Sequence, residues 1–202
     1  MKKTYITNIS LQSKAGLLKV EYEPKGFDLN NNRSTCFPII PVIAANQEEG
    51  DEVTVLAVRS NTSDTPDNYA VFLEELSQVG IKEEQVEEIS VEENQSGSVS
   101  MELLLTILKK IPDESVVYGD ITFGTKPMSA ILLYAMSFVE KMKNCEVEGI
   151  YYGEIPRKQG ELSGTPTLYD LTMFKLLGDV IDQLKSLEIR DMETALNRLV
   201  RS

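Results

Sequence analysis

The sequence of 202 residues contains no histidine, no tryptophan and only two cysteines. The lack of an imidazole excludes catalytic triads, zincin motifs and histidine-dependent ribonucleases. Cys36 and Cys145 lie far apart and form no C-x-x-C pair, so we expect neither a zinc site nor a redox motif. Both read as small buried residues of a reduced, cytoplasmic protein that carries no metal and no cofactor.

Basic residues are also scarce. Lys and Arg total 20 against 32 Asp and Glu, which gives a net charge of −12. Broad binding to nucleic acid or to an acidic membrane needs clustered cations, so we expect no non-specific nucleic acid partner and no membrane. No stretch approaches the length of a membrane span, and the acidic run at 83–93 is typical of a solvated face rather than a metal site. An anionic ligand would need a local pocket.

Strand and helix patterns alternate after a predicted N-terminal β-hairpin, Thr4–Leu11 with Leu17–Glu23. We predict further strands at 53–58, 85–91, 115–122 and 147–152, and helices at 35–46, 65–79, from a Ser98 or Ser100 cap to 111, 127–143, 169–184 and 191–201. This order predicts an α/β, Rossmann-like, mostly parallel doubly wound sheet. We expect one domain over 1–202, with a core at about 1–153 and C-terminal helices at 165–202 that cover the sheet or a dimer surface.

Ligands of such sheets bind beyond the carboxyl ends of the strands, which singles out the loops at 9–14, 59–61 and 120–127. The third loop, DITFGTKP, places small residues, hydroxyls and a lysine at a helix N-terminus, where free N–H groups favour phosphate. A plain strand-to-helix turn with a surface lysine explains the same spacing, and both interpretations stay open here.

Two nucleotide motifs are tested on this loop. Gly119 and Gly124 have P-loop spacing, but Thr125-Lys126-Pro127 replaces the required Lys followed by Ser or Thr. No G-x-G-x-x-G follows a predicted strand. The sequence therefore favours neither an NTPase nor a dehydrogenase.

The segment 118–127, YGDITFGTKP, resembles the CRISPR-associated Rossmann fold (CARF) family, in the branch marked by Asp-x-Thr-His-Gly and a following basic residue. Phe123 stands where that branch has histidine. The hairpin with Val20-Glu21-Tyr22, the VTVLAV strand, the helix after Pro127 and the segments at 149–152 and 165–171 follow the order of the family. The likeness spans most of the chain, although only the decapeptide is specific.

The resemblance implies a homodimer that binds a cyclic oligoadenylate, the second messenger of type III CRISPR immunity, in a two-fold symmetric cleft. Amides around Gly124 would contact phosphate, and two copies of Lys126 would supply local charge. The ligand-binding residues that we infer are Ser10, Gln12, Ser13, Lys14, Arg59, Asn61, Thr122, Phe123, Gly124, Thr125, Lys126, Arg157 and Lys158.

We expect a CARF domain without an effector domain, and two functions fit such a domain. A metal-independent ring nuclease would cleave the ligand, most readily cyclic tetra-adenylate, by in-line attack of a ribose 2′-hydroxyl. Lys126 and Ser10 are the catalytic candidates, Ser13 or Lys14 would also serve to orient the hydroxyl, and Arg157 or Lys158 would close as a lid. A sensor or sponge would bind the same ligand without cleaving it. A domain for another small nucleotide is a third interpretation.

Overall fold

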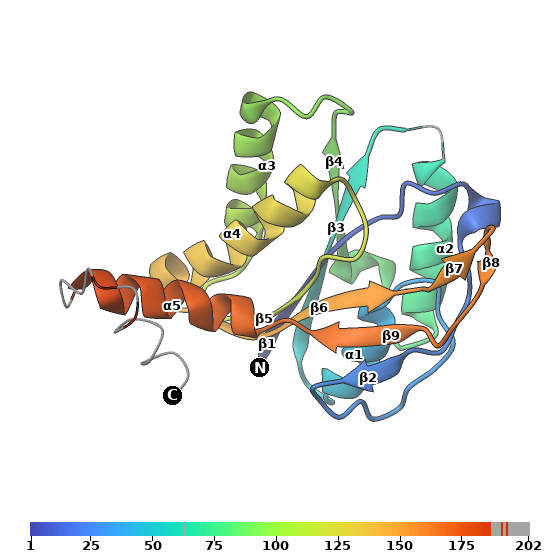
Figure 1. Cartoon of the computed structure of the whole chain (residues 1–202), viewed down its shortest axis with the longest axis horizontal. Coiled ribbons are helices and arrows are strands. Elements are labelled where there is room, and N and C mark those ends of the chain that lie inside the picture. Colours follow the sequence, from blue (N-terminus) through green and yellow to red (C-terminus); the bar gives the residue numbers. More distant parts are fainter. Residues whose placement is uncertain (63, 187–190, 192, 194–202) are drawn as a thin grey trace. The chain divides into compact units, whose positions relative to one another are not determined.

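The computed structural model describes residues 1–62, 64–186, 191 and 193, apart from the side chains of residues 14, 176 and 182–186. It divides into two compact units, Met1–Asp170 and Leu171–Ser202. The first unit is an α/β fold built on a seven-stranded, mostly parallel sheet (Figure 1), which confirms the predicted fold class. The second unit contains helix α5 (Met173–Ser186).

The order in which the chain adds strands to the sheet reverses at its first strand. The strand order is β2 (Glu23–Lys25), β9 (Thr167–Asp170), β6 (Glu146–Glu154), β5 (Val116–Asp120), β1 (Lys2–Asn8), β3 (Glu52–Ser60) and β4 (Val86–Val91). Only the β6–β9 pair is antiparallel. From β1 the chain moves outward to β3 and β4, and then returns to β5 on the other side of β1. The β1/β5 boundary is therefore the point where a doubly wound sheet opens a crevice.

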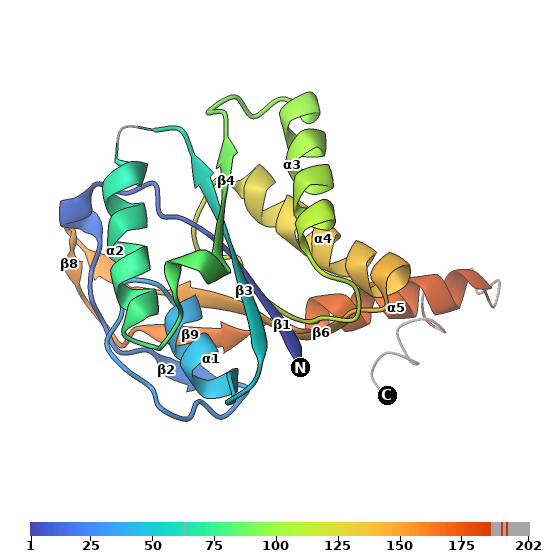
Figure 2. The ribbon, with the colours of Figure 1, turned by 180° about the vertical axis from the view of Figure 1, so that it is seen from behind.

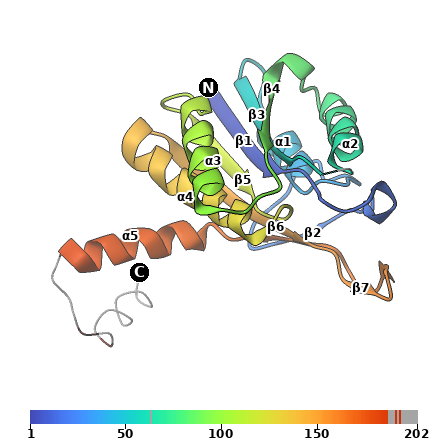
Figure 3. The ribbon, with the colours of Figure 1, turned by 90° about the horizontal axis from the view of Figure 1, so that it is seen from above.

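Two helices cover each face of this sheet. Helices α1 (Ile39–Asn46) and α2 (Thr65–Ser77) lie on one face, and α3 (Gly97–Lys110) and α4 (Lys126–Lys143) lie on the other (Figures 2 and 3). β1 is buried at every position after Lys2, as expected of a central strand covered on both sides. Tyr5 and Ile9 pack into the core with residues of α1 and α2.

The predicted N-terminal hairpin is wrong. β1 pairs in parallel with β3 and β5, so no hairpin partner lies beside it. The segment 17–23 runs elsewhere and makes only an isolated bridge between Val20 and Thr35, while β2 begins at Glu23 and pairs in parallel with β9. Alternating residues favour a strand, but they do not specify which segment pairs with it.

Several boundaries also differ from the predictions. The side chain of Ser96, not that of Ser98 or Ser100, caps α3 by accepting from the Val99 amide. Tyr169 belongs to strand β9, so the helix predicted at 169–184 begins only at Met173. A small hairpin of β7 (Arg157–Lys158) and β8 (Glu161–Leu162) lies between β6 and β9, where no strand was predicted. The helix predicted at 191–201 lies almost entirely outside the described residues, and the placement of the C-terminal helices stays a prediction.

Candidate functional site

The crevice at the β1/β5 boundary brings together two of the three loops that the sequence singled out. Thr7 of β1 lies opposite Asp120 of β5, so the loop after Asn8 and the turn after Asp120 leave the sheet side by side. The side-chain amide of Asn8 donates to the Phe123 carbonyl over 3.0 Å and joins the two segments. This contact places the predicted loops 9–14 and 120–127 at one edge.

The carboxylate of Asp120 organises this edge. It is fully buried and accepts from the Thr7 hydroxyl at 3.0 Å and from the Thr122 amide at 2.9 Å. The Thr122 hydroxyl also donates to it, and the backbone N–H of Ile39 stabilises its charged form. One side chain thus ties β1, the turn and the start of α1 together.

Burial raises the pKa of Asp120 to about 6, although the hydrogen bonds from Thr122, Thr7 and Ile39 act in the opposite direction. The protonated carboxyl is therefore favoured in the folded state relative to the unfolded chain. Since the folded protein holds an extra proton between the ordinary pKa of about 4 and a pKa of about 6, folding stability falls as the pH rises through this window.

A pH series tests this assignment against Asp120→Asn. Between pH 4 and pH 7 the wild type should lose about 2–3 kcal/mol of unfolding free energy relative to the variant, which cannot titrate at this position. Urea unfolding at several pH values measures the difference, and all other titrating groups cancel between the two proteins. Parallel profiles would mean that Asp120 titrates as an ordinary exposed carboxylate does.

The turn after β5 presents backbone donors at the start of α4. Gly124 adopts a left-handed conformation, with φ of 87°, and the Thr125 side chain caps the helix by accepting from the Met128 amide. Among the described residues, no hydrogen-bond acceptor is found for the backbone N–H groups of Gly124, Thr125 and Lys126. These donors lie at the positive end of an 18-residue helix.

Gly124 is required at this turn for two reasons. Its left-handed φ strains any residue with a Cβ, and a Cβ there would lie 3.0 Å from Cβ and Cγ of Asn8. Gly124→Ala should therefore cost about 2–3 kcal/mol in urea unfolding. Gly160→Ala is a matched control, because Gly160 has a φ of 88° but open space around it. If both variants lost the same unfolding free energy, the close approach to Asn8 would contribute nothing to the requirement for glycine at position 124.

Two side chains that we expected to contact the ligand, those of Thr122 and Phe123, instead make contacts inside the protein. The Thr122 hydroxyl is already engaged, since it donates to Asp120 and accepts from the Gly153 amide at 2.7 Å. The Phe123 ring packs edge-on against Phe37, with centroids 5.9 Å apart, and belongs to the core on that face. The side chains of Thr122 and Phe123 therefore stabilise the turn. The backbone of the turn and the side chain of Lys126 are left to contact a ligand.

The loop after β1 is stabilised by Asn68 of helix α2, a residue that the sequence patterns did not single out. Asn68 of α2 donates from its amide to the carbonyls of Ser10 at 2.9 Å and Gln12 at 2.7 Å. Ser10 is itself fully buried, and its hydroxyl accepts from the Gln12 amide. Ser10 therefore shapes the loop from inside, whereas Gln12 and Ser13 are exposed. The side chain of Lys14 lies outside the described part.

Asn8 and Asn68 share an unusual feature. Both side chains are fully buried, and the carbonyl oxygen of each has no hydrogen-bond donor among the described residues. No spacing pattern in the sequence predicts either residue, because each acts through a tertiary contact. A buried acceptor without a donor is costly, but both oxygens are enclosed, so they belong to the support of this edge and not to its contact surface.

Arg157 lies on the β7/β8 hairpin and contacts the loop after β1. Its guanidinium donates to the Gln12 side-chain oxygen at 3.1 Å and to the Gly16 carbonyl at 2.7 Å. Both acceptors are neutral, and no carboxylate pairs with Arg157 among the described residues. Lys158 follows it on the same exposed strand. The predicted lid residue Arg157 is thus placed over the loop after β1 with its charge uncompensated.

Arg59 has a different environment. Its guanidinium binds the carboxylate of Glu88 on the neighbouring strand β4, through Nε at 2.7 Å and through Nη2. Asn61 accepts from the Ser90 hydroxyl at 2.7 Å. The predicted loop 59–61 is thus occupied by contacts with β4, and the positive charge of Arg59 is already neutralised.

A small hollow lies beside the start of α4, and its lining includes Thr125, Pro127 and Ser60. Glu92 and Glu93 also line it, so this hollow repels an anion, and the free amides of the turn are the better phosphate site. Within the described part of the chain, no cluster of three or more His, Cys, Asp and Glu side chains is arranged to hold a metal ion. Over the same residues, no helix is both long and apolar enough to cross a membrane.

The arrangement is thus a set of backbone donors and two cationic side chains at the switch point of a Rossmann-like sheet. No protein-family model matches the sequence, and no curated protein matches it at a significant level.

Proposed function

We propose that the β1/β5 crevice binds a cyclic oligoadenylate in a homodimer, as the CARF-like turn implies. One observation carries the proposal. The amides of Gly124, Thr125 and Lys126 have no acceptor within the described chain, and they open helix α4 beside an exposed lysine. Consecutive free amides at a helix N-terminus are a general phosphate-binding arrangement. The turn is also rigidly supported by Asp120.

The distribution of cations supports an anionic ligand despite the net charge of −12. Lys126 is exposed and has no carboxylate partner among the described residues, and Arg157 is held only by neutral acceptors. A two-fold symmetric ring would meet each of these groups twice. Distant carboxylates matter less, because charges beyond about 8 Å are largely screened at physiological ionic strength.

Cleavage of the bound ring is the enzymatic form of this proposal. The ribose 2′-hydroxyl would lose its proton as its oxygen attacks the adjacent phosphorus. The bond from phosphorus to the 5′-oxygen would break, and the 5′-oxygen would take up a proton. The product would be a linear chain with a 2′,3′-cyclic phosphate. Lys126 would stabilise the negative charge that develops on phosphate.

Binding without cleavage is the second form, and the burial of Ser10 favours it. The hydroxyl of Ser10 is enclosed and accepts from the Gln12 amide, so it is poorly placed to orient a ribose hydroxyl. Asp120, the carboxylate nearest the turn, is buried beneath it. A tight sensor needs the same amides and cations as a nuclease but no group that moves a proton.

A single-turnover assay tests both forms. The protein is held in excess over labelled cyclic tetra-adenylate in EDTA, and products are separated by mass. Linear fragments that end in 2′,3′-cyclic phosphate establish the ring nuclease, and intact ligand retained on the protein establishes the sensor. Cyclic hexa-adenylate is run in parallel. If neither ring is retained or cleaved, the proposal is overturned and the crevice is left for another small nucleotide.

A further inference from the structure

Strand β4 ends the sheet on the side away from the crevice, and its outer side is unpaired. Among the described residues it pairs only with β3, and no strand lies beyond it in the sheet order (Figure 2). The opposite end of the sheet is β2, which has three residues and contains Pro24. Short strands and prolines discourage further pairing at an edge. β4 has six residues and no proline, so it is the edge that is open to another strand.

The register of β4 shows which backbone groups point outward. The carbonyl of Val91 accepts from the Asn61 amide at 2.9 Å, so the backbone of Val91 faces β3. Backbone groups of successive residues in a strand point to opposite sides, and those of Ser90 and Glu88 therefore face away from β3. Within the described chain, no hydrogen bond is found for these outward groups. They form a row of donors and acceptors with the spacing of a strand.

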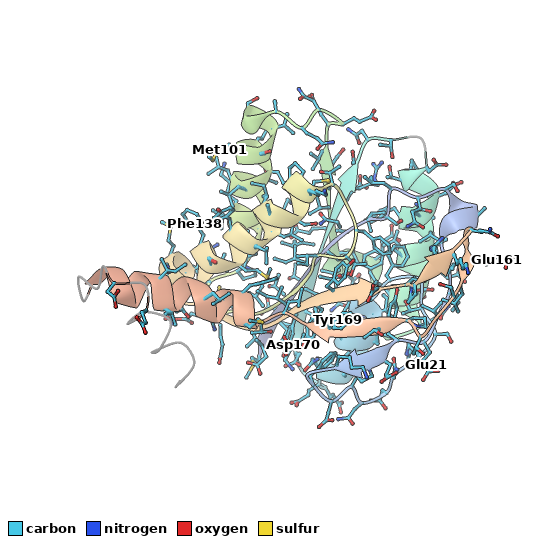
Figure 4. The ribbon with its side chains drawn as sticks, in the orientation of Figure 1. Glu21, Met101, Phe138, Glu161, Tyr169 and Asp170 are labelled. Atoms are coloured by element: carbon cyan, nitrogen blue, oxygen red, sulfur yellow. The ribbon has the colours of Figure 1, made fainter. Side chains whose placement is uncertain are left out.

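A hollow on the α3 side of this edge is acidic. Ile89 and Val91 of β4 line it together with Glu92 and Glu102. Glu102 follows Met101, which Figure 4 labels on α3. Both carboxylates are exposed, and neither has an ion-pair partner among the described residues. The hollow therefore attracts a cationic side chain.

A second hollow, on the α2 side of the same edge, offers apolar contacts. Leu73, Leu76 and Val86 line it, and Lys82 and Glu83 add opposite charges. Because α2 and α3 cover opposite faces of the sheet, the two hollows flank β4 from opposite faces. Successive side chains of a strand point to opposite faces. A strand added to β4 would thus place alternate side chains over the acidic hollow and over the apolar one.

We propose that β4 accepts an extended segment of a partner protein as an eighth strand, with basic and apolar residues in alternation. Main-chain hydrogen bonds to Glu88 and Ser90 provide the pairing, and the two hollows select the side chains. A second copy of this chain is disfavoured at this edge. It would bring its own Glu92 and Glu102 and a net charge of −12 to an acidic surface. The inference does not depend on the nucleotide site.

Fluorescence anisotropy with the full chain tests the pairing. The probe is a fluorescein-labelled peptide with capped ends, Lys-Val-Lys-Val-Lys-Val-Lys, and it should bind saturably. Glu in place of each Lys should weaken binding at least about tenfold. Two further probes carry N-methyl groups on the backbone amides of all Lys or of all Val residues. Only one of these two sets of amides faces β4 in a paired strand, so one methylated peptide should lose binding and the other should keep it.

Ser90→Pro tests the same edge from the protein side. The Ser90 N–H faces away from β3, so proline removes no hydrogen bond of the sheet and suits an edge position. This variant should bind the peptide at least about tenfold more weakly. Ser90→Ala is the matched control, because it also loses the hydroxyl that donates to Asn61 but keeps the backbone donor, and it should bind as the wild type does.

The acidic hollow is tested with Glu102→Gln, which should weaken binding of the peptide about threefold. Glu161→Gln removes an exposed carboxylate of β8 and should have no effect.

Three results would overturn the inference: no saturable binding by the wild type, equal binding of both methylated peptides, or equal affinity of Ser90→Pro and Ser90→Ala. Circular dichroism checks that Ser90→Pro is folded, and if it is not, the methylated peptides decide the question on the wild type. Self-association of the wild type that Ser90→Pro abolishes, without peptide binding, would assign the edge to a second copy and overturn the inference as well.

Discussion

Asp120→Ala should lower the unfolding free energy at pH 7 by about 3–5 kcal/mol, because it leaves buried donors without an acceptor. The carboxylate accepts from the Thr122 amide, the Thr122 hydroxyl and the Thr7 hydroxyl, and the Ile39 amide adds to this set. The Thr7 hydroxyl has a second acceptor in the Asn8 carbonyl at 3.3 Å. The two backbone amides have no such alternative within the described chain, so they account for most of the loss.

Urea unfolding measures this loss, with two variants for comparison. Asp120→Asn keeps one carbonyl oxygen for the Thr122 donors and should lose less than Asp120→Ala. Glu161→Ala removes an exposed carboxylate of β8 and should change stability by no more than about 0.5 kcal/mol. If Asp120→Ala fell within the same range as Glu161→Ala, the turn would be held by something other than this carboxylate.

The same substitution should also impair the site. Thr122 accepts from the Gly153 amide while it donates to Asp120, so Asp120 fixes the turn with respect to both β1 and the end of β6. Loss of the carboxylate would release the segment that orients the amides of Gly124 and Thr125. We therefore expect Asp120→Ala to weaken ligand binding even under conditions where the protein remains folded.

Features that depend on local periodicity were predictable from the sequence. The apolar run VTVLAV forms the centre of β3, and the Thr125-Lys126-Pro127 segment starts α4, because a strand buried on both faces and a helix start each leave a local pattern. The proximity of loops 9–14 and 120–127 followed from the topology of a doubly wound sheet. These predictions needed no knowledge of tertiary contacts.

Features that depend on register or on a distant partner were not predictable. The segment 17–23 alternates as a strand does, but its neighbour is set by the whole sheet and not by the nearest strand in sequence. The sequence also shows no sign that Arg59 meets Glu88, 29 positions away, since that contact requires the parallel register of β3 and β4. Asn68 likewise acts on carbonyls more than 50 positions away. Each of these contacts changes which side chains are free to meet a ligand.

The different environments of Arg59 and Lys126 make the strongest prediction about the ligand. Lys126→Gln should weaken binding of the cyclic oligoadenylate by at least about 100-fold. A charge-assisted contact to phosphate contributes about 1.5–3 kcal/mol, and a two-fold ring would lose two of them. Titration calorimetry with the wild type and the variant measures the change. For the nuclease, the single-turnover rate should fall as well, because the same cation faces the charge that develops on phosphate.

Arg59→Gln is the matched control for Lys126→Gln. Both variants remove one positive charge from a chain whose net charge is −12, so any effect of net charge on the approach of an anion is the same for both. The guanidinium of Arg59 is already compensated by Glu88, and its loss should therefore change affinity less than about threefold. Equal losses would assign the effect to overall charge. Unchanged affinity in Lys126→Gln would instead place the phosphate away from the start of α4. Among the described residues, it would then lie near Arg157, the other uncompensated cation that contacts the loop after β1.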